Sequence, residues 1–285
     1  LAVDGTMALT THGTGAATVV NDAGLNFAAS TVGGALSATA TTGNITQGSG
    51  NLAITGAATF ITVAGGSNII LDGSGNAFAA AVTLRAGDGT DEAFGNITFV
   101  DSAAVKLHTS AGTNGDLFID GHPDRAVGGN LSITARAGDI TQGAAVAVTG
   151  TSSFTTLTNN RTITLSNTGN AFAGAVTLST TGSSAHATLD NGTANIDIAA
   201  ASVGGNLTLT SGAATSGSNY AIMDSGTVTV GGNLIATTNA NSGVINMGTL
   251  AVTGTITLTT HGSGAATIDN GTANIDIAAA SVGGN

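Results

Sequence analysis

The chain has 285 residues, among them 44 glycines, one proline and no cysteine, and only 7% of its residues are charged, with a net charge of −11. This composition excludes collagen, which needs glycine at every third position and abundant proline, and it excludes a disulfide-stabilised scaffold. Five basic residues in an acidic chain argue against nucleic-acid binding, and abundant glycine and threonine argue against long helices.

Repeats dominate the first two thirds of the chain. The run VGGALSATATTGNITQG from Val32 recurs as VGGNLSITARAGDITQG from Val127, and NAFAAAVTL at 76–84 recurs as NAFAGAVTL at 170–178. Phenylalanines in this part follow one another at spacings of about 19 residues. A short fixed period is typical of solenoids, in which each repeat stacks on its neighbours. The sequence therefore predicts rungs of about 19–20 residues.

Short alternating runs then mark strands, at 195–199, 206–210, 227–230 and 255–259. In each run Leu, Ile or Val alternates with Thr or Asp, as in a half-buried strand. The GG, GN, NG and SG pairs between runs are turn signals, and scarce proline keeps a strand ladder unbroken. We predict an all-β parallel β-helix (β-solenoid) with roughly three short strands per rung, as a single continuous repeat region over 1–285.

The end of the chain repeats an earlier segment. DNGTANIDIAAASVGGN occupies both 190–206 and 269–285. The motif VGGN begins at 203, 230 and 282, and the two gaps are interpreted as one and one-third and two and two-thirds rungs. The motif is therefore expected at different corners of a triangular cross-section. Because the chain starts at Leu1 and stops in a motif that elsewhere runs into a strand, we expect a fragment of a longer protein.

The run from 129 to 179 resembles the repeats of filamentous-haemagglutinin-like large repetitive adhesins, which bacteria secrete by the two-partner route. The motifs G-x-I-T-Q, V-x-G-x-x-x-F and N-x-F-x-G-x-V carry the resemblance over most of the chain. The resemblance implies a right-handed parallel β-helix on a secreted, cell-surface fibre and an outer-membrane transporter as the secretion partner. Other implied partners are a host or neighbouring cell surface, its glycans and further copies of the chain.

No cofactor, nucleic acid or membrane insertion is expected, since no apolar run reaches the roughly 18 residues that a membrane span needs.

Three basic residues form the first candidate site. Arg85, Lys106 and Arg125 each follow a phenylalanine at the same distance along the chain, so a rung of the predicted length would stack them in one column. Like charges about 5 Å apart repel by about 1 kcal/mol in water. An anionic glycan or partner would offset that repulsion. Pairing with nearby carboxylates is the interpretation that we favour.

Acidic residues form two further candidates. Asp101 and Asp120 stand one predicted rung apart, and stacked carboxylates can cleave polysaccharide as general acid and base or hold a cation. No aromatic platform for sugar accompanies them, so outward-facing turn residues are favoured. Asp88, Asp91 and Glu92 in the turn GDGTDEAFG could bind Ca²⁺, but their spacing does not match a known calcium loop. No catalytic residue or metal site is assigned.

Asparagine sequons are frequent in this chain, which is rich in Asn, Thr and Ser, and most are expected to arise by chance. They stand at Asn44, Asn96, Asn130, Asn160, Asn191, Asn206 and Asn270.

The sequence as a whole predicts a non-catalytic structural protein, the shaft of a secreted bacterial cell-surface adhesin or extracellular matrix fibre. The first alternative is a self-assembling extracellular filament or sheath subunit, because open solenoid ends invite pairing. The second is a β-helical polysaccharide-degrading enzyme acting through Asp101 and Asp120. An ice-binding solenoid is least favoured, since its threonines would need one register over many rungs.

Overall fold

The computed structural model describes residues 1–87, 95–108, 116–119, 127–214 and 220–284. Within these ranges the regular structure consists of strands, without a helix and so without a helix able to cross a membrane. The chain divides into two compact units. Unit 1 holds Leu1–Gly138 with Val148–Gly150, and unit 2 holds Asp139–Ala147 with Thr151–Asn285. A single continuous region over 1–285 stays a prediction.

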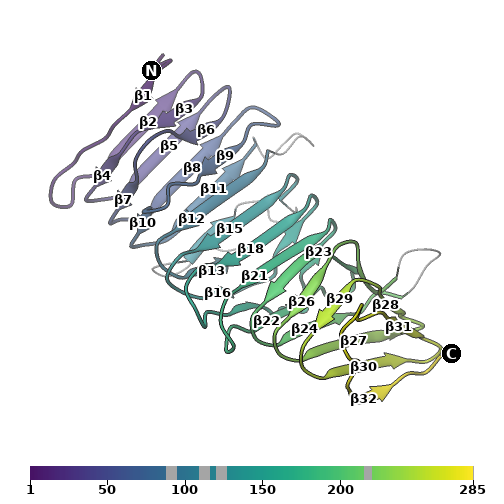
Figure 1. Cartoon of the computed structure of the whole chain (residues 1–285). Helices are drawn as coiled ribbons and strands as arrows, with labels where there is room; N and C mark the ends of the chain where they lie inside the picture. The colour runs from purple at the N-terminus through teal and green to yellow at the C-terminus, as the bar shows by residue number, and fades with distance from the viewer. Residues whose placement is uncertain (88–94, 109–115, 120–126, 215–219, 285) are drawn as a thin grey trace. The chain divides into compact units, whose positions relative to one another are not determined.

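The strands of unit 1 form two long parallel ladders and a short one (Figure 1). The first ladder contains, in order, β1 (Thr6–Met7), β3 (Leu25–Phe27), β6 (Ile45–Gln47), β9 (Ile69–Leu71), β12 (Ile97–Asp101) and β15 (Leu131–Ala135). The second contains β2 (Ala17–Asn21), β5 (Leu36–Ala40), β8 (Ala58–Thr62), β11 (Val82–Ala86), β14 (Asp116–Ile119) and β13 (Val105–His108). The short ladder contains β4 (Ser30–Val32), β7 (Leu52–Ile54) and β10 (Ala77–Phe78). From β1 to β12, successive turns of the chain add one strand to each long ladder, which makes unit 1 a parallel β-solenoid; in the second ladder β14 then lies between β11 and β13.

Unit 2 has the same construction. Its first ladder contains β18 (Ser152–Thr156), β21 (Val176–Thr180), β23 (Ile196–Val203), β25 (Ile222–Asp224), β28 (Ile245–Met247) and β31 (Ala266–Ile268). Alongside them, β26 (Val228–Val230) and β29 (Leu250–Val252) continue from the second half of β23. The second ladder contains β16 (Ile140–Gln142), β19 (Ile163–Leu165), β22 (Ala187–Asp190), β24 (Leu207–Ser211), β27 (Leu234–Asn241), β30 (Ile256–His261) and β32 (Ile277–Ser281). The short strands β17 (Ala147–Val148), of which Val148 belongs to unit 1, and β20 (Ala171–Phe172) complete the described set.

The register of these ladders measures one turn directly. Ala17 pairs with Leu36, Leu36 with Ala58 and Ala58 with Val82, so each of these three turns is longer than the one before. The predicted rung matches the first of them and is too short for the other two.

Unit 2 contains a longer turn still, between β24 and β27, where the hydrogen bond from Asn233 to Asn206 spans 27 residues. Val203 pairs with Val230, so the first two VGGN motifs lie one whole turn apart at the same corner. The third motif, which begins at Val282, directly follows β32 of the second ladder, so the prediction of different corners is wrong for the first gap and confirmed for the second. The prediction of about three strands per rung is confirmed where β3, β4 and β5 make up one turn.

The phenylalanine spacing misled because it reports contacts between ladders. Phe27 on β3, Phe60 on β8 and Phe78 on β10 belong to three different ladders of unit 1. Their rings meet edge to face in the core, with centroids 6.0 and 6.2 Å apart, and Phe99 continues the series at 5.2 Å from Phe78. Edge-to-face pairs are favourable by about 0.5–1.5 kcal/mol beyond burial. The rings thus lie on different faces of the solenoid, so the number of residues between two successive phenylalanines is not the length of one turn.

Several strands place their fifth side chain inside the corner of the solenoid. Thr62, Thr180 and Thr238 are buried there. Each hydroxyl donates to a carbonyl oxygen of the corner loop that follows its strand, at 3.1, 2.8 and 3.0 Å. A buried polar group needs such a partner, so the bond ties the end of the strand to the corner loop that follows it.

Backbone contact between successive turns explains much of the glycine. A Cβ added to Gly33 would lie 1.9 Å from the carbonyl oxygen of Gly13, and one added to Gly95 would lie 1.8 Å from that of Ser67. No side chain fits at that distance. These glycines let one turn lie directly on the next.

Candidate functional site

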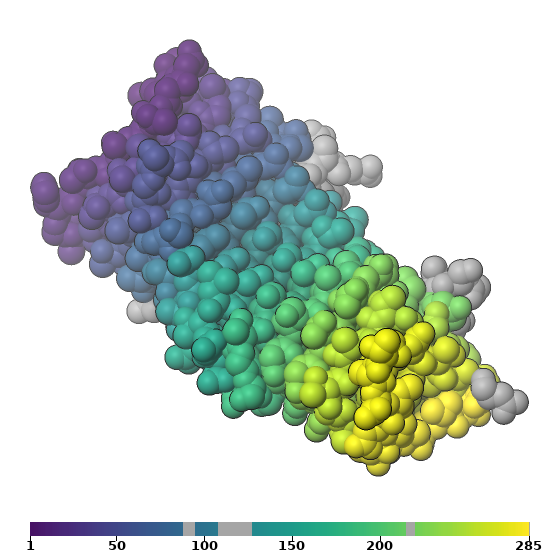
Figure 2. Space-filling model, in the orientation of Figure 1, coloured from purple at the N-terminus to yellow at the C-terminus, as the bar shows by residue number. Residues whose placement is uncertain are grey.

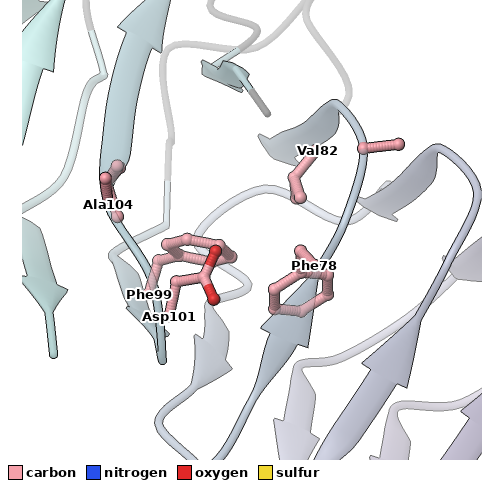
Figure 3. Close-up of a pocket in the computed structure, with 7 residues that line it drawn as sticks. Phe78, Val82, Phe99, Asp101 and Ala104 are labelled. Carbon is pink, nitrogen blue, oxygen red and sulfur yellow. The ribbon is translucent and has the colours of Figure 1, made fainter. Parts of the chain in front are cut away.

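Asp101, the last residue of β12, is a candidate acidic residue within the described ranges. Its side chain is 5% exposed, and Figure 3 shows the carboxylate beside the ring of Phe99 and facing Phe78. The amide of Ala103 donates to Oδ1 at 3.3 Å, and the backbone amides of Phe78 and Ser102 also bond to the carboxylate. Burial raises the pKa of Asp101, and these backbone hydrogen bonds oppose the rise.

The space next to this carboxylate is small. The cavity measures about 10 Å³, roughly the room for one water molecule, and is lined by Phe78, Ala80, Val82, Phe99, Asp101, Ala104 and Val105. A sugar ring does not fit there. Asp101 ends a five-residue strand as Thr62 does, but its carboxylate accepts from a backbone amide of the following loop, whereas the Thr62 hydroxyl donates to a carbonyl oxygen. The expectation of an outward-facing side chain is wrong, because 97, 99 and 101 share the inward face of β12.

Asp120, Asp88, Asp91 and Glu92 lie outside the described residues. The stacked acidic pair and the calcium-binding turn therefore stay predictions. The part of the chain that the structure describes contains no group of three or more His, Cys, Asp or Glu residues close enough to hold a metal ion.

The register separates two of the three basic candidates. Arg85 lies on β11 and Lys106 on β13, with β14 between these strands. Val82 of β11 and Leu107 of β13 both pair with Leu117 of β14. Arg85 follows Val82 along its strand whereas Lys106 precedes Leu107, so the two basic residues do not stand in line across the sheet. The predicted single column is wrong for this pair, since a phenylalanine spacing is not a turn. Arg125 lies outside the described residues, and binding of an anionic glycan stays a prediction.

Two recurring motifs meet in a buried pair of side-chain amides, which we call the amide clamp. Gln47 of the ITQ motif donates from Nε2 to Oδ1 of Asn76 at 2.7 Å, and Asn76 of the NAF motif donates from Nδ2 to Oε1 of Gln47 at 2.9 Å. Asn76 also accepts from the amide of Leu52 at 2.9 Å and donates to the carbonyl of Leu71 at 3.3 Å. Both amides are buried. The clamp ties two turns together.

Unit 2 contains the same clamp. Gln142 and Asn170 exchange the same two hydrogen bonds, and Oδ1 of Asn170 accepts from the amide of Val146 at 2.9 Å. Sequence reasoning recognised both motifs without connecting them. The available signal was their similar separation, 29 residues from Gln47 to Asn76 and 28 residues in unit 2. These motifs are therefore internal fastenings of the solenoid.

In a second set of buried asparagines, the side-chain amide bonds to both the backbone amide and the carbonyl of one residue, as a neighbouring strand would. Asn191 accepts from the amide of Phe172 at 2.7 Å and donates to its carbonyl at 3.0 Å, while a further bond reaches the carbonyl of Asn195 at 2.6 Å. Asn270 and Asn21 each bond to the amide and carbonyl of one residue in the same way. The sequons at Asn191 and Asn270 therefore have their amide nitrogens buried and in use.

Exposed asparagines form a further series in unit 1, the asparagine ladder. Oδ1 of Asn44 accepts from the amide of Asn68 at 2.8 Å, Oδ1 of Asn68 from Asn96 at 2.7 Å, and Oδ1 of Asn96 from Asn130 at 2.8 Å. Each side chain thus receives the amide of the turn that follows. Each of these hydrogen bonds lies just before the first residue of a β-strand and adds one bond between successive turns.

Comparisons with known proteins give one family. A family model described as Repeats of unknown function (DUF5649) matches residues 14–85 and 94–179, more than half of the chain. Each matched stretch contains one amide clamp and ends shortly after the phenylalanine of the NAF motif. No curated protein and no solved structure matches the chain.

Proposed function

Because the chain belongs to the family Repeats of unknown function (DUF5649), and its two units are parallel β-solenoids, we propose that it is the structural shaft of a secreted bacterial cell-surface adhesin or extracellular matrix fibre. One observation supports this most directly. The phenylalanines of the shared NAF motifs are buried, and the shared Gln and Asn residues join one turn to the next in the amide clamps. Repeats whose shared residues join successive turns fit a structural role, because each added repeat makes the solenoid longer.

The proposed role is mechanical. In a parallel ladder successive residues of a strand bond alternately to the turn before and the turn after it, at a strand spacing of about 4.8 Å, and buried side chains fill the space between ladders. Such a stack resists stretching because many hydrogen bonds share the load. The absence of cysteine suits a chain that crosses an envelope unfolded, since no disulfide can form on the way.

The resemblance to filamentous-haemagglutinin-like adhesins supports the proposed location and partners. The chain would leave the cell through an outer-membrane transporter and act between that cell and a host or neighbouring surface, whose glycans other parts of the fibre would bind. Immunogold electron microscopy of intact cells with an antibody against the chain tests this. We expect label on thin surface fibres, and none on a deletion strain. Label confined to the cell interior would overturn the proposal.

The enzymatic alternative has less support. Asp101 is 5% exposed and faces a cavity of about 10 Å³, which does not admit a polysaccharide. Incubation of the chain with acidic polysaccharides is expected to release no new ends. Turnover that Asp101→Asn abolishes would favour the enzyme instead.

A further inference from the structure

Two corners of unit 2 begin with the same three residues, Asp-Asn-Gly, at 190–192 and 269–271. An asparagine that is followed by glycine is prone to deamidation, because glycine has no side chain to hinder the approach of its backbone nitrogen. That nitrogen bonds to Cγ of the asparagine, the Cγ–Nδ2 bond breaks, and the nitrogen's proton leaves with Nδ2 as ammonia. Water then opens the resulting cyclic imide to aspartate or isoaspartate.

The fold fixes both reacting groups at the first of these corners. The side chain of Asn191 is 0% exposed, and its three hydrogen bonds, at 2.7, 3.0 and 2.6 Å, join it to Phe172 and Asn195. The backbone nitrogen of Gly192 donates to Oδ1 of Asp190 at 2.9 Å. The amide group of Asn191 therefore cannot turn toward that nitrogen without losing its hydrogen bonds, and its burial keeps water away.

The second corner repeats this arrangement. Asn270 is 2% exposed, its Oδ1 accepts from the amide of Val252 at 2.8 Å, and its Nδ2 donates to the carbonyl of Val252 at 3.2 Å. A further bond joins Nδ2 to the carbonyl of Asn274 at 2.7 Å, and the amide of Gly271 donates to Asp269 at 2.8 Å. The same three residues are thus held in the same way at both places.

Deamidation would change what the corner at 190–192 can bond to. The new carboxylate accepts hydrogen bonds but donates none, so the carbonyl oxygens of Phe172 and Asn195 would lose their donor and face a negative charge in a buried site. An isoaspartate would also add a methylene group to the main chain ahead of β23, which shifts the register of that strand. The corner could not close again as before.

We propose that Asn191, and with it the equivalent Asn270, is a latent deamidation site: unreactive while the solenoid is closed, reactive when its corner opens. Figure 2 shows the turns of unit 2, in teal to yellow, in close contact on the face in view, and separation of such turns is the opening that the reaction requires. Each reaction makes one opening of the solenoid permanent. The inference concerns these corners and does not rest on the proposed surface role.

Peptide mass spectrometry measures the conversion, because exchange of the amide for a carboxyl group raises the mass. The unmodified chain is incubated at mildly alkaline pH, either folded or unfolded in urea, and the preceding residues, HATL and AATI, distinguish the two sites. We expect conversion of Asn191 in urea and conversion at least about 100-fold slower in the folded chain, which corresponds to an opening free energy of about 3 kcal/mol. Equal rates in the two states, or no conversion in urea, would overturn the proposal.

Two substitutions on β22 test whether opening limits the rate. Leu189→Ala removes a fully buried side chain two residues before Asn191 and should accelerate conversion in the folded chain at least about ten-fold, since the loss of a buried leucine favours opening. The matched control is Thr188→Ala, because Thr188 is half-buried on the outward face of the same strand, and its rate should stay within about three-fold of the unmodified chain. Equal rates in the two variants would contradict control by opening.

Asn191→Asp reproduces one product directly. It should melt at a lower temperature than the unmodified chain, because the carbonyls of Phe172 and Asn195 lose their donor. The control is Asn206→Asp, since Oδ1 of Asn206 accepts from the amide of Asn233 at 2.9 Å, which a carboxylate oxygen does equally well. Unchanged melting of Asn191→Asp would show that the corner closes again after deamidation and would overturn the permanence of the change.

Discussion

The amide clamp of unit 1 predicts a large effect from a single polar substitution. Asn76→Ala removes four hydrogen bonds inside the solenoid. Gln47 loses only part of its hydrogen bonding, because its Nε2 still donates to the carbonyl oxygen of Gly50 and its Oε1 still accepts from the amide of Gly73. The amide of Leu52 loses its bond to Asn76 in a buried site. One orphaned buried donor costs about 1–3 kcal/mol and each lost hydrogen bond about 1 kcal/mol, so we expect about 3–5 kcal/mol in total.

Hydrogen exchange measured by mass spectrometry on peptides from β7 gives the local free energy, even if the two units unfold separately. At about 1.4 kcal/mol per factor of ten, exchange of the Leu52 amide should accelerate at least about 100-fold. The control is Asn51→Ala, because Asn51 is exposed and its side-chain oxygen accepts from the amide of Gly75, at 2.9 Å. That variant should lose less than about 1 kcal/mol.

A double-mutant cycle separates the clamp from mere loss of packing. If Gln47 and Asn76 act as a pair, Gln47→Ala combined with Asn76→Ala should cost about 1–3 kcal/mol less than the two single losses added together. Strictly additive losses, or a loss below about 1 kcal/mol for Asn76→Ala, would refute the reasoning.

Further predictions follow from individual contacts. Burial raises the pKa of Asp101, so the folded state holds a proton that the unfolded state releases; the unfolding free energy should fall as pH rises from about 4 through the folded-state pKa, and urea titrations should lose this fall in Asp101→Asn. Gly95→Ala places a methyl group 1.8 Å from the carbonyl oxygen of Ser67 and should lower the melting temperature, whereas Gly5→Ala meets nothing within 4 Å; equal melting of the two would contradict the close backbone contact. Phe60→Ala removes a fully buried ring between two others and should cost about 3–5 kcal/mol in urea unfolding, and a loss below about 1 kcal/mol would show that the core is not packed in this way.

The parallel solenoid could be predicted because local chemistry determines it. Strict alternation in runs such as 36–40 predicts strands with one buried face, and the structure confirms that pattern. The length of a turn could not be predicted in the same way. The turn from β24 to β27 is longer than the turn from β2 to β5, because extra residues fit into corner loops without disturbing the ladder. Ring contacts between ladders then supplied a regular but misleading spacing.

The candidate site was predicted less well, for a related reason. Asp101 has the same parity as Phe99 in β12, so alternation alone could have predicted its burial. The prediction that Arg85 and Lys106 form one column was wrong because it relied on an incorrect turn length and because β14 lies between their strands. The partnership of Gln47 with Asn76 was hidden for the same reason, since their separation exceeds the predicted rung.

Equivalent repeats on different faces bear on how such a chain grows. Leu36–Ala40 lies in the second ladder of unit 1, whereas its repeat, Leu131–Ala135, lies in the first. Both strands show the same alternation of buried and half-buried residues, so one sequence suits either face. A gene segment copied by unequal crossing-over therefore need not encode a whole number of turns to be accommodated. We therefore expect natural variants of this chain to differ in length by amounts that are not whole numbers of turns.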